Sequence, residues 1–161
     1  MSVGSVYQYY PNRDALLAAV LEKHLLEVVE AVEHACGECH GKTVGEMASG
    51  FVVAFLAVKL RDPMVSKALY AIAAERGGAE LVVRINSRML AATAHMLTTA
   101  TDACFEDPDL TASIAVHALF GPVRALLEGY ASPEFGACLE QQLTLLLTAY
   151  LQVHQSVKSR P

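Results

Sequence analysis

Apolar residues recur along this chain at the spacing of amphipathic helices. The first long segment shows this most clearly, because three- and four-residue intervals there give one apolar stripe of Leu16, Leu17, Val20, Leu21, Leu25 and Val28. No segment shows the turn-bounded alternation of apolar and polar residues that predicts a strand. The pattern therefore predicts an all-α fold, with helices near residues 2–9, 12–36, 43–60, 63–76, 79–105, 108–130 and 133–157.

Helix ends are marked by capping residues and glycines. Three capping residues stand directly before a proline, in Asp62-Pro63, Asp107-Pro108 and Ser132-Pro133. Proline suits the first helical position because the N–H it lacks would have no intrahelical partner there. Asn12 is a fourth expected cap. The segments Gly37 to Gly41 and Arg76-Gly77-Gly78 predict breaks between helices.

The last two predicted helices are apolar over much more of their circumference than the first. Their apolar residues are Val116, Leu119, Phe120, Val123, Leu126, Leu127 and Tyr130 in one, and Leu139, Leu143, Leu145, Leu146, Leu147, Tyr150 and Leu151 in the other. We expect one face of each to meet the core and another to meet a second copy, which predicts a homodimer through residues 108–157. A hairpin buried within a monomer is the alternative. Gly121-Pro122 predicts a kink and a close approach by another backbone.

Composition and charge narrow the classes of partner. Apolar residues make up 53% of the 161 residues and charged residues only 18%, so more apolar surface is expected than a monomer can bury. The net charge of −5 gives no general affinity for phosphate backbones. No uninterrupted apolar run reaches the length of a membrane span, and no signal peptide precedes the body. We therefore expect a cytoplasmic protein with no membrane partner and with reduced cysteines.

The first sixteen or so residues contain the most specific pattern in the chain. Ser2-Val3-Gly4-Ser5-Val6-Tyr7-Gln8-Tyr9-Tyr10, followed by Pro11-Asn12-Arg13-Asp14, resembles the recognition helix and following turn of the tetracycline-repressor (TetR) family. That family has Ser-x-Gly-Ser/Thr-aliphatic-Tyr-x-aromatic-aromatic and then Pro-Asn/Ser-Lys/Arg-acid. The number, order and length of the remaining predicted helices are also similar to the family's ligand-binding and dimerisation region.

The resemblance implies that the first residues read DNA. Small residues let a helix enter the major groove, Val3 can contact a thymine methyl group, and Tyr hydroxyls can reach phosphates. The expected DNA-binding residues are Ser2, Val3, Gly4, Ser5, Tyr7, Gln8, Tyr9 and Arg13. Two helices precede the recognition helix in the family, and the sequence begins where that helix starts. We therefore expect residues 1–11 to be a remnant of the DNA-binding domain, 12–157 a ligand-binding and dimerisation domain, and 158–161 a tail.

An apolar effector pocket is the second feature that the resemblance implies. Residues one turn apart on the predicted helices 43–60 and 79–105 could line it, and methionine suits a pocket that accepts varied apolar ligands. The expected lining is Phe51, Phe55, Ile85, Met89, Ala92, His95 and Met96. An ordinary close-packed core is the alternative for each of these residues. His95 and His117 lie within apolar segments, where a core position is also expected.

Cys36-Gly37-Glu38-Cys39-His40 spells the attachment pattern for a c-type haem. That chemistry belongs to exported proteins, and no second pair of zinc ligands follows at suitable spacing. A turn between helices with Cys36 facing the core is the simpler interpretation. We expect no cofactor and no metal. Since no nucleophile stands beside a base and no glycine-rich phosphate loop is present, we also expect no enzyme.

Together these patterns predict a ligand-responsive transcriptional regulator of the TetR family, and a repressor is the family's usual mode. It would be a homodimer that binds operator DNA in its complete form and an apolar small molecule in its pocket. Ligand binding would tilt the long helix 12–36 and move the two recognition helices apart. One alternative is a dimeric small-molecule-binding or interaction protein that does not contact DNA. The other is a haem or metal protein built on Cys36, Cys39 and His40.

Overall fold

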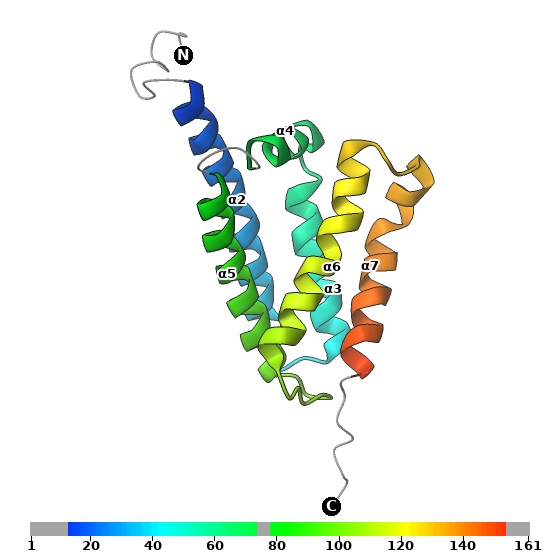
Figure 1. The fold of residues 1–161 in the computed structure, drawn as a ribbon. Helices are drawn as coiled ribbons and strands as arrows, with labels where there is room; N and C mark the ends of the chain where they lie inside the picture. The colour runs from blue at the N-terminus through cyan, green and yellow to red at the C-terminus, as the bar shows by residue number, and fades with distance from the viewer. Residues whose placement is uncertain (1–12, 74–77, 154–161) are drawn as a thin grey trace, which may run out of the picture.

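The computed structural model describes residues 13–73 and 78–153, and within those ranges it is helical with no strand (Figure 1). This confirms the all-α prediction. Its helices are α2 (Arg13–Glu38), α3 (Val44–Lys59), α4 (Pro63–Ala73), α5 (Gly78–Thr98), α6 (Pro108–Glu128) and α7 (Pro133–Val153). α2 packs along α5 and α3, α7 packs against α3 and α6, and the short α4 lies across one end (Figure 1).

The predicted capping residues are confirmed wherever the structure describes them. Asp62 and Asp107 each accept a hydrogen bond from the backbone N–H three residues on, at 3.1 and 2.8 Å. Ser132 does the same at 3.3 Å. Thr43 and Glu46 add a reciprocal capping box at the start of α3. The predicted helix 2–9 and the Asn12 cap lie outside the described residues.

Two predicted helix ends differ from the structure, that of α2 by two residues and that of α5 by seven. α2 continues through Gly37 to Glu38, and the chain turns at Gly41, whose φ of +71° favours glycine. α5 ends at Thr98 rather than near residue 105. The Thr98 and Thr99 hydroxyls donate to carbonyls three residues back, which competes with helix continuation.

One apolar core joins α2, α3, α5, α6 and α7. Leu21 and Val28 of α2 are buried as the stripe predicted, whereas Val20 is exposed. α2 has 26 residues, about 39 Å at 1.5 Å per residue, and α3 has only 16. The N-terminal turns of α2 therefore extend past the end of α3, where fewer neighbours can cover them (Figure 1).

α6 is long and apolar enough to cross a membrane by length and composition, although no uninterrupted apolar run predicted this. Its inner face packs in the core through Ala115, Leu119 and Val123, among others. The helix is continuous across Pro122. Such packing is typical of the core helix of a helical domain, so its apolar composition has an explanation within the fold.

Candidate functional site

Most of the predicted pocket residues come together in the interior. Phe51, Phe55, Ile85, Met89 and Met96 are buried in the core cluster, and Ala92 packs against it from a half-buried position. The rings of Phe51 and Phe55 are stacked with centroids 6.4 Å apart. Phe120 of α6, which the sequence did not place in this set, packs on Phe55 at 5.7 Å. These residues form a contiguous aromatic and thioether interior.

His95 does not belong to this interior, so its predicted place among the lining residues is wrong. It is exposed, and its ring packs edge-on against the exposed His40 with centroids 4.8 Å apart. His117 is exposed as well, where a core position was expected, and its Nδ1 lies 2.7 Å from the Ser113 carbonyl oxygen. Both histidines fall on the outer faces of helices whose inner faces are apolar.

A buried polar junction, which the sequence did not predict, lies where α2, α3 and α4 meet. The Ser66 hydroxyl donates to the Lys59 carbonyl oxygen at 2.7 Å, and His24 Nε2 lies 3.5 Å from the same hydroxyl. Lys59 is 7% exposed, and His24 and Ser66 are also buried. The signal that could have revealed the junction is the position of Lys59, four residues after Phe55 on a helix with an apolar inner face.

Burial changes the proton affinity of both basic groups at the junction. It lowers the pKa of Lys59 to about 8. Burial also lowers the pKa of His24, and the positive charge of Lys59 adds to that effect. At the rim of the junction Arg61 forms an ion pair with Glu27, which lowers the pKa of that carboxyl group. The interior of the domain thus contains an ammonium group at the end of an apolar region.

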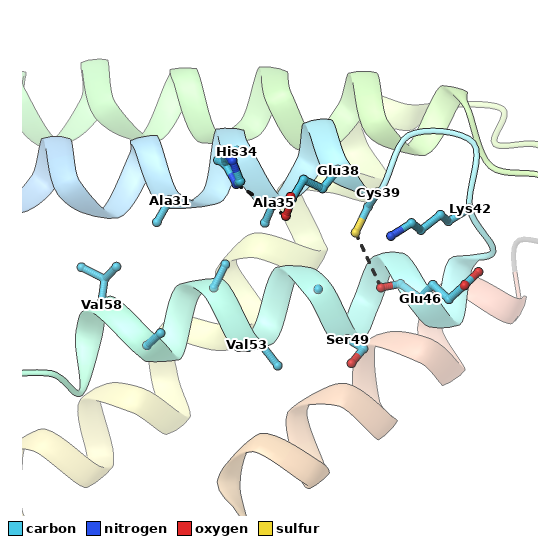
Figure 2. A pocket seen from close by; sticks show the side chains of 13 residues that line it. Ala31, His34, Ala35, Glu38, Cys39, Lys42, Glu46, Ser49, Val53 and Val58 are labelled. Atoms are coloured by element: carbon cyan, nitrogen blue, oxygen red, sulfur yellow. Dashed lines mark hydrogen bonds and ion pairs between the residues drawn. The ribbon is translucent and has the colours of Figure 1, made fainter.

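A groove of about 620 Å³ runs between α2 and α3 on the outside of the bundle. Figure 2 shows Ala31 and Ala35 of α2 on one side of the groove and Val58 of α3 on the other, with Glu38, Lys42 and Glu46 toward one end. None of the predicted pocket residues lines it. The small residues at positions 50, 54 and 57 of α3 were the available signal, since helical spacing puts them on one face.

The Cys36–His40 segment does not gather its side chains into one site. Cys36 and Cys39 are both buried, and their sulfurs lie 4.0 Å from Thr93 Oγ1 and 3.8 Å from the Glu46 carbonyl oxygen. Burial raises the pKa of Cys36 to about 11, which disfavours the thiolate that binds metal. In the part of the chain that the structure describes, no group of three or more His, Cys, Asp or Glu residues could hold a metal ion.

Both helices of the predicted dimerisation face carry exposed apolar residues, here called the exposed stripes. On α6, Leu110, Ile114 and Gly121 are exposed at four- and seven-residue spacing. On α7, Leu145 and Leu146 are 61% and 48% exposed. The other faces of both helices are buried through residues such as Leu119 and Leu147, as the broad apolar pattern predicted. A single chain therefore leaves large side chains uncovered along both helices. The kink predicted at Gly121-Pro122 stays a prediction.

The predicted DNA-binding residues Ser2 to Tyr9 lie outside the described residues. Arg13 is the first residue of α2, and the helix that follows it is fixed to α5 by ion pairs. Arg84 contacts Glu22 at 3.1 Å, and Arg88 makes two hydrogen bonds to Glu33 at 2.9 and 2.7 Å. The arginines of α5 thus attach it to the long helix.

The comparison with protein families gives one match over most of the chain. The family described as "Tetracyclin repressor-like, C-terminal domain" matches residues 43–151, which spans α3 to α7. No curated protein and no solved structure matches the chain. The matched range contains the aromatic interior, Lys59 and both exposed stripes.

Proposed function

The chain belongs to the tetracycline repressor-like family, and on that basis we propose that it is the ligand-binding and dimerisation part of a transcriptional regulator. Domains of this family belong to regulators rather than enzymes. In the proposal, residues 12–157 form a homodimer that binds an apolar small molecule, and residues 1–11 belong to a DNA reader. Repression is the proposed mode, and the cytoplasm is the proposed location.

The observation that most supports the proposal is the pair of exposed stripes on α6 and α7. Two copies related by a two-fold axis could bury these stripes against each other as a four-helix bundle. Obligate homodimers usually bury more than about 800 Å² on each partner, and two helices of 21 residues can supply an interface of that size. Gly121 also supports the seam, because nothing lies within 4 Å of the place where its β-carbon would be.

The aromatic and thioether interior supports the effector pocket. Unbranched methionine side chains such as Met89 and Met96 repack easily around an entering apolar molecule. Its proposed lining comprises Phe51, Phe55, Ile85, Met89, Ala92 and Met96. In the proposal a larger side chain at Ala92 would obstruct the ligand, and Ala92 lies on α5 and not on the helices of the proposed seam.

In this proposal α2 transmits the effect of ligand binding to the DNA reader. The helix links the proposed reader at its N-terminal end to the interior at its C-terminal half. A small tilt at the interior would become a larger shift at the far end of this helix, which is about 39 Å long. The residues proposed to contact DNA are Ser2, Val3, Gly4, Ser5, Tyr7, Gln8, Tyr9 and Arg13.

A two-part experiment tests this function. First, the purified chain is screened by thermal shift against a panel of apolar compounds, and any compound that stabilises it is retested on Ala92→Phe. The proposal predicts that Ala92→Phe loses the shift and stays dimeric. Second, the product of the entire reading frame is used to select DNA from random duplexes, with and without that compound. A dimer that responds to the compound but selects no DNA would instead establish the alternative, a binding protein that does not contact DNA.

A further inference from the structure

Two histidine rings meet on the surface where the connection between α2 and α3 passes the C-terminal end of α5, at the end of the bundle opposite α4 (Figure 1). His40 belongs to the connection and His95 to α5. Their ring centroids are 4.8 Å apart, with an angle of 62° between the ring planes, and both side chains are exposed. The sequence did not predict this pair because the two positions lie far apart along the chain.

The backbone that carries the two rings is held in place by hydrogen bonds between the same two segments. The Gly41 N–H, one residue after His40, donates to Thr99 Oγ1 at 3.0 Å. The Thr101 N–H donates to the Lys42 carbonyl oxygen, also at 3.0 Å. These bonds fix the spacing of the two histidines before any ligand arrives, and such preorganisation lowers the entropic cost of binding.

The separation of the rings suits one metal ion held between them. Imidazole nitrogens bind Zn²⁺ at about 2.0–2.1 Å, usually in tetrahedral geometry. With the ring radius added on each side, two imidazoles that share such an ion place their ring centroids about 5 Å apart. The observed 4.8 Å is close to that value. Because both side chains are exposed, the rings can turn about their broad terminal torsions and direct one nitrogen each toward the ion.

The chemistry of the two ligands determines which ions the pair selects. Imidazole suits Ni²⁺, Cu²⁺ and Zn²⁺, whereas Mg²⁺ and Ca²⁺ prefer oxygen ligands. Within residues 13–73 and 78–153 no group of three His, Cys, Asp or Glu side chains could hold a metal ion, so a third protein ligand does not join the pair there. Water would complete the coordination, which makes binding reversible.

We propose that His40 and His95 together bind one divalent transition-metal ion, such as Ni²⁺ or Zn²⁺, on the surface of the domain. The ion joins the connection after α2 to the end of α5, and so adds a link between the C-terminal ends of these two helices. The site lies outside the proposed effector pocket and does not depend on it.

Isothermal titration with Ni²⁺ at pH 7.5 measures the site. Cys104 and Cys138 expose thiols that also bind such ions, so they are first blocked with iodoacetamide. We expect one Ni²⁺ per chain and no binding of Mg²⁺ at the same concentration. His40→Ala and His95→Ala should each weaken Ni²⁺ binding at least ten-fold. His34→Ala, which removes another exposed imidazole near the end of α2, should leave it unchanged.

The double variant distinguishes one shared ion from two separate histidines. If the rings share the ion, His40→Ala already abolishes the site, and adding His95→Ala should weaken binding no further. Ni²⁺ should also raise the melting temperature of the wild type, because an ion that binds the folded chain stabilises it. The double variant should show a much smaller rise. His40→Gln and His95→Gln replace the alanine variants if either does not fold.

The remaining outcomes would overturn the inference. Binding that survives in both single variants would place the ion elsewhere. Losses that add in the double variant would show two independent ligands rather than a shared ion. A wild-type chain that binds Ni²⁺ no more tightly than Mg²⁺ would show that the two rings make an aromatic contact only.

Discussion

The sulfur of Cys39 lies so close to Gly50 that a β-carbon at position 50 would stand 2.6 Å from it. No real β-carbon makes so short a contact, so a side chain at this position must displace the sulfur or move α3 away from α2. The thiol is buried and donates a hydrogen bond to the Glu46 carbonyl oxygen, which restricts its movement. Gly50 therefore sets how closely α2 and α3 pack at the end of the groove.

Gly50→Ala should destabilise the protein by about 1–2 kcal/mol, because overpacking costs more than the improved helix propensity returns. Gly37→Ala is the matched control, since nothing lies within 4 Å of a β-carbon there. The control should be neutral or stabilise by up to about 1 kcal/mol. Urea unfolding measures both free energies. In the double variant Gly50→Ala, Cys39→Ala, the two changes in the free energy of unfolding should not add, because the β-carbon no longer meets the sulfur. Strict additivity would contradict the contact.

Replacing Lys59 with Met should stabilise the chain at pH 7 by about 1–3 kcal/mol, because an apolar side chain needs no desolvation. The pKa of Lys59 is about 8 in the folded protein and 10.5 in the unfolded chain. Below pH 8 the folded protein therefore contains a buried ammonium group, which lowers the free energy of unfolding. This penalty disappears as the pH rises from 8 to 10.5. Urea unfolding at pH 7 and pH 10 should show a smaller difference between the proteins at pH 10. A difference independent of pH would be inconsistent with a buried, charged Lys59.

The lowered pKa of the buried His24 predicts that the protein loses stability at mildly acidic pH. Burial and the charge of Lys59 lower its pKa in the folded protein, so below about pH 6.5 the unfolded chain binds a proton that the folded one excludes. Stability should fall as the pH drops through that value. The urea midpoint of the wild type should decrease more between pH 7.5 and 5.5 than that of His24→Gln. Parallel decreases in the two proteins would show that His24 titrates normally.

Gly121→Ala separates the stability of a single chain from that of the dimer. Nothing within the chain obstructs a β-carbon at this position, and alanine is the better helix former. If another copy packs closely there, the same methyl group should weaken the dimer several-fold. Analytical ultracentrifugation across a dilution series measures the dissociation constant, with Gly37→Ala as the control. An unchanged constant would remove Gly121 from the seam.

Local signals predicted the parts of the fold that local chemistry determines. Asp62, Asp107 and Ser132 each cap a helix through the next few residues, so their sequence neighbours sufficed. The end of α5 was missed because threonine hydroxyls compete with the helix at Thr98 and Thr99. Periodicity alone cannot reveal that competition.

The candidate site was predictable only where it is apolar. Phe51 and Phe55 followed from spacing, since apolar residues on one helical face are usually buried together. Lys59 and His24 did not, because burial of a charged side chain depends on which helices cover it. The prediction that His95 lines the interior was wrong for the converse reason. It lies on an apolar helix, but on the face that the fold leaves uncovered.

The proposed function depends most on the proposed seam of α6 and α7, and sedimentation equilibrium on matched variants tests it. Leu146 is 48% exposed in the single chain and Val53, on the outside of α3, is 45% exposed. A charge costs little at either position in a monomer, but Leu146→Glu would bury two carboxylates near the two-fold axis of the dimer. At micromolar concentration we predict a dimeric wild type, a dimeric Val53→Glu and a monomeric, folded Leu146→Glu. A monomeric wild type, or a Leu146→Glu protein that stays fully dimeric, would contradict the account.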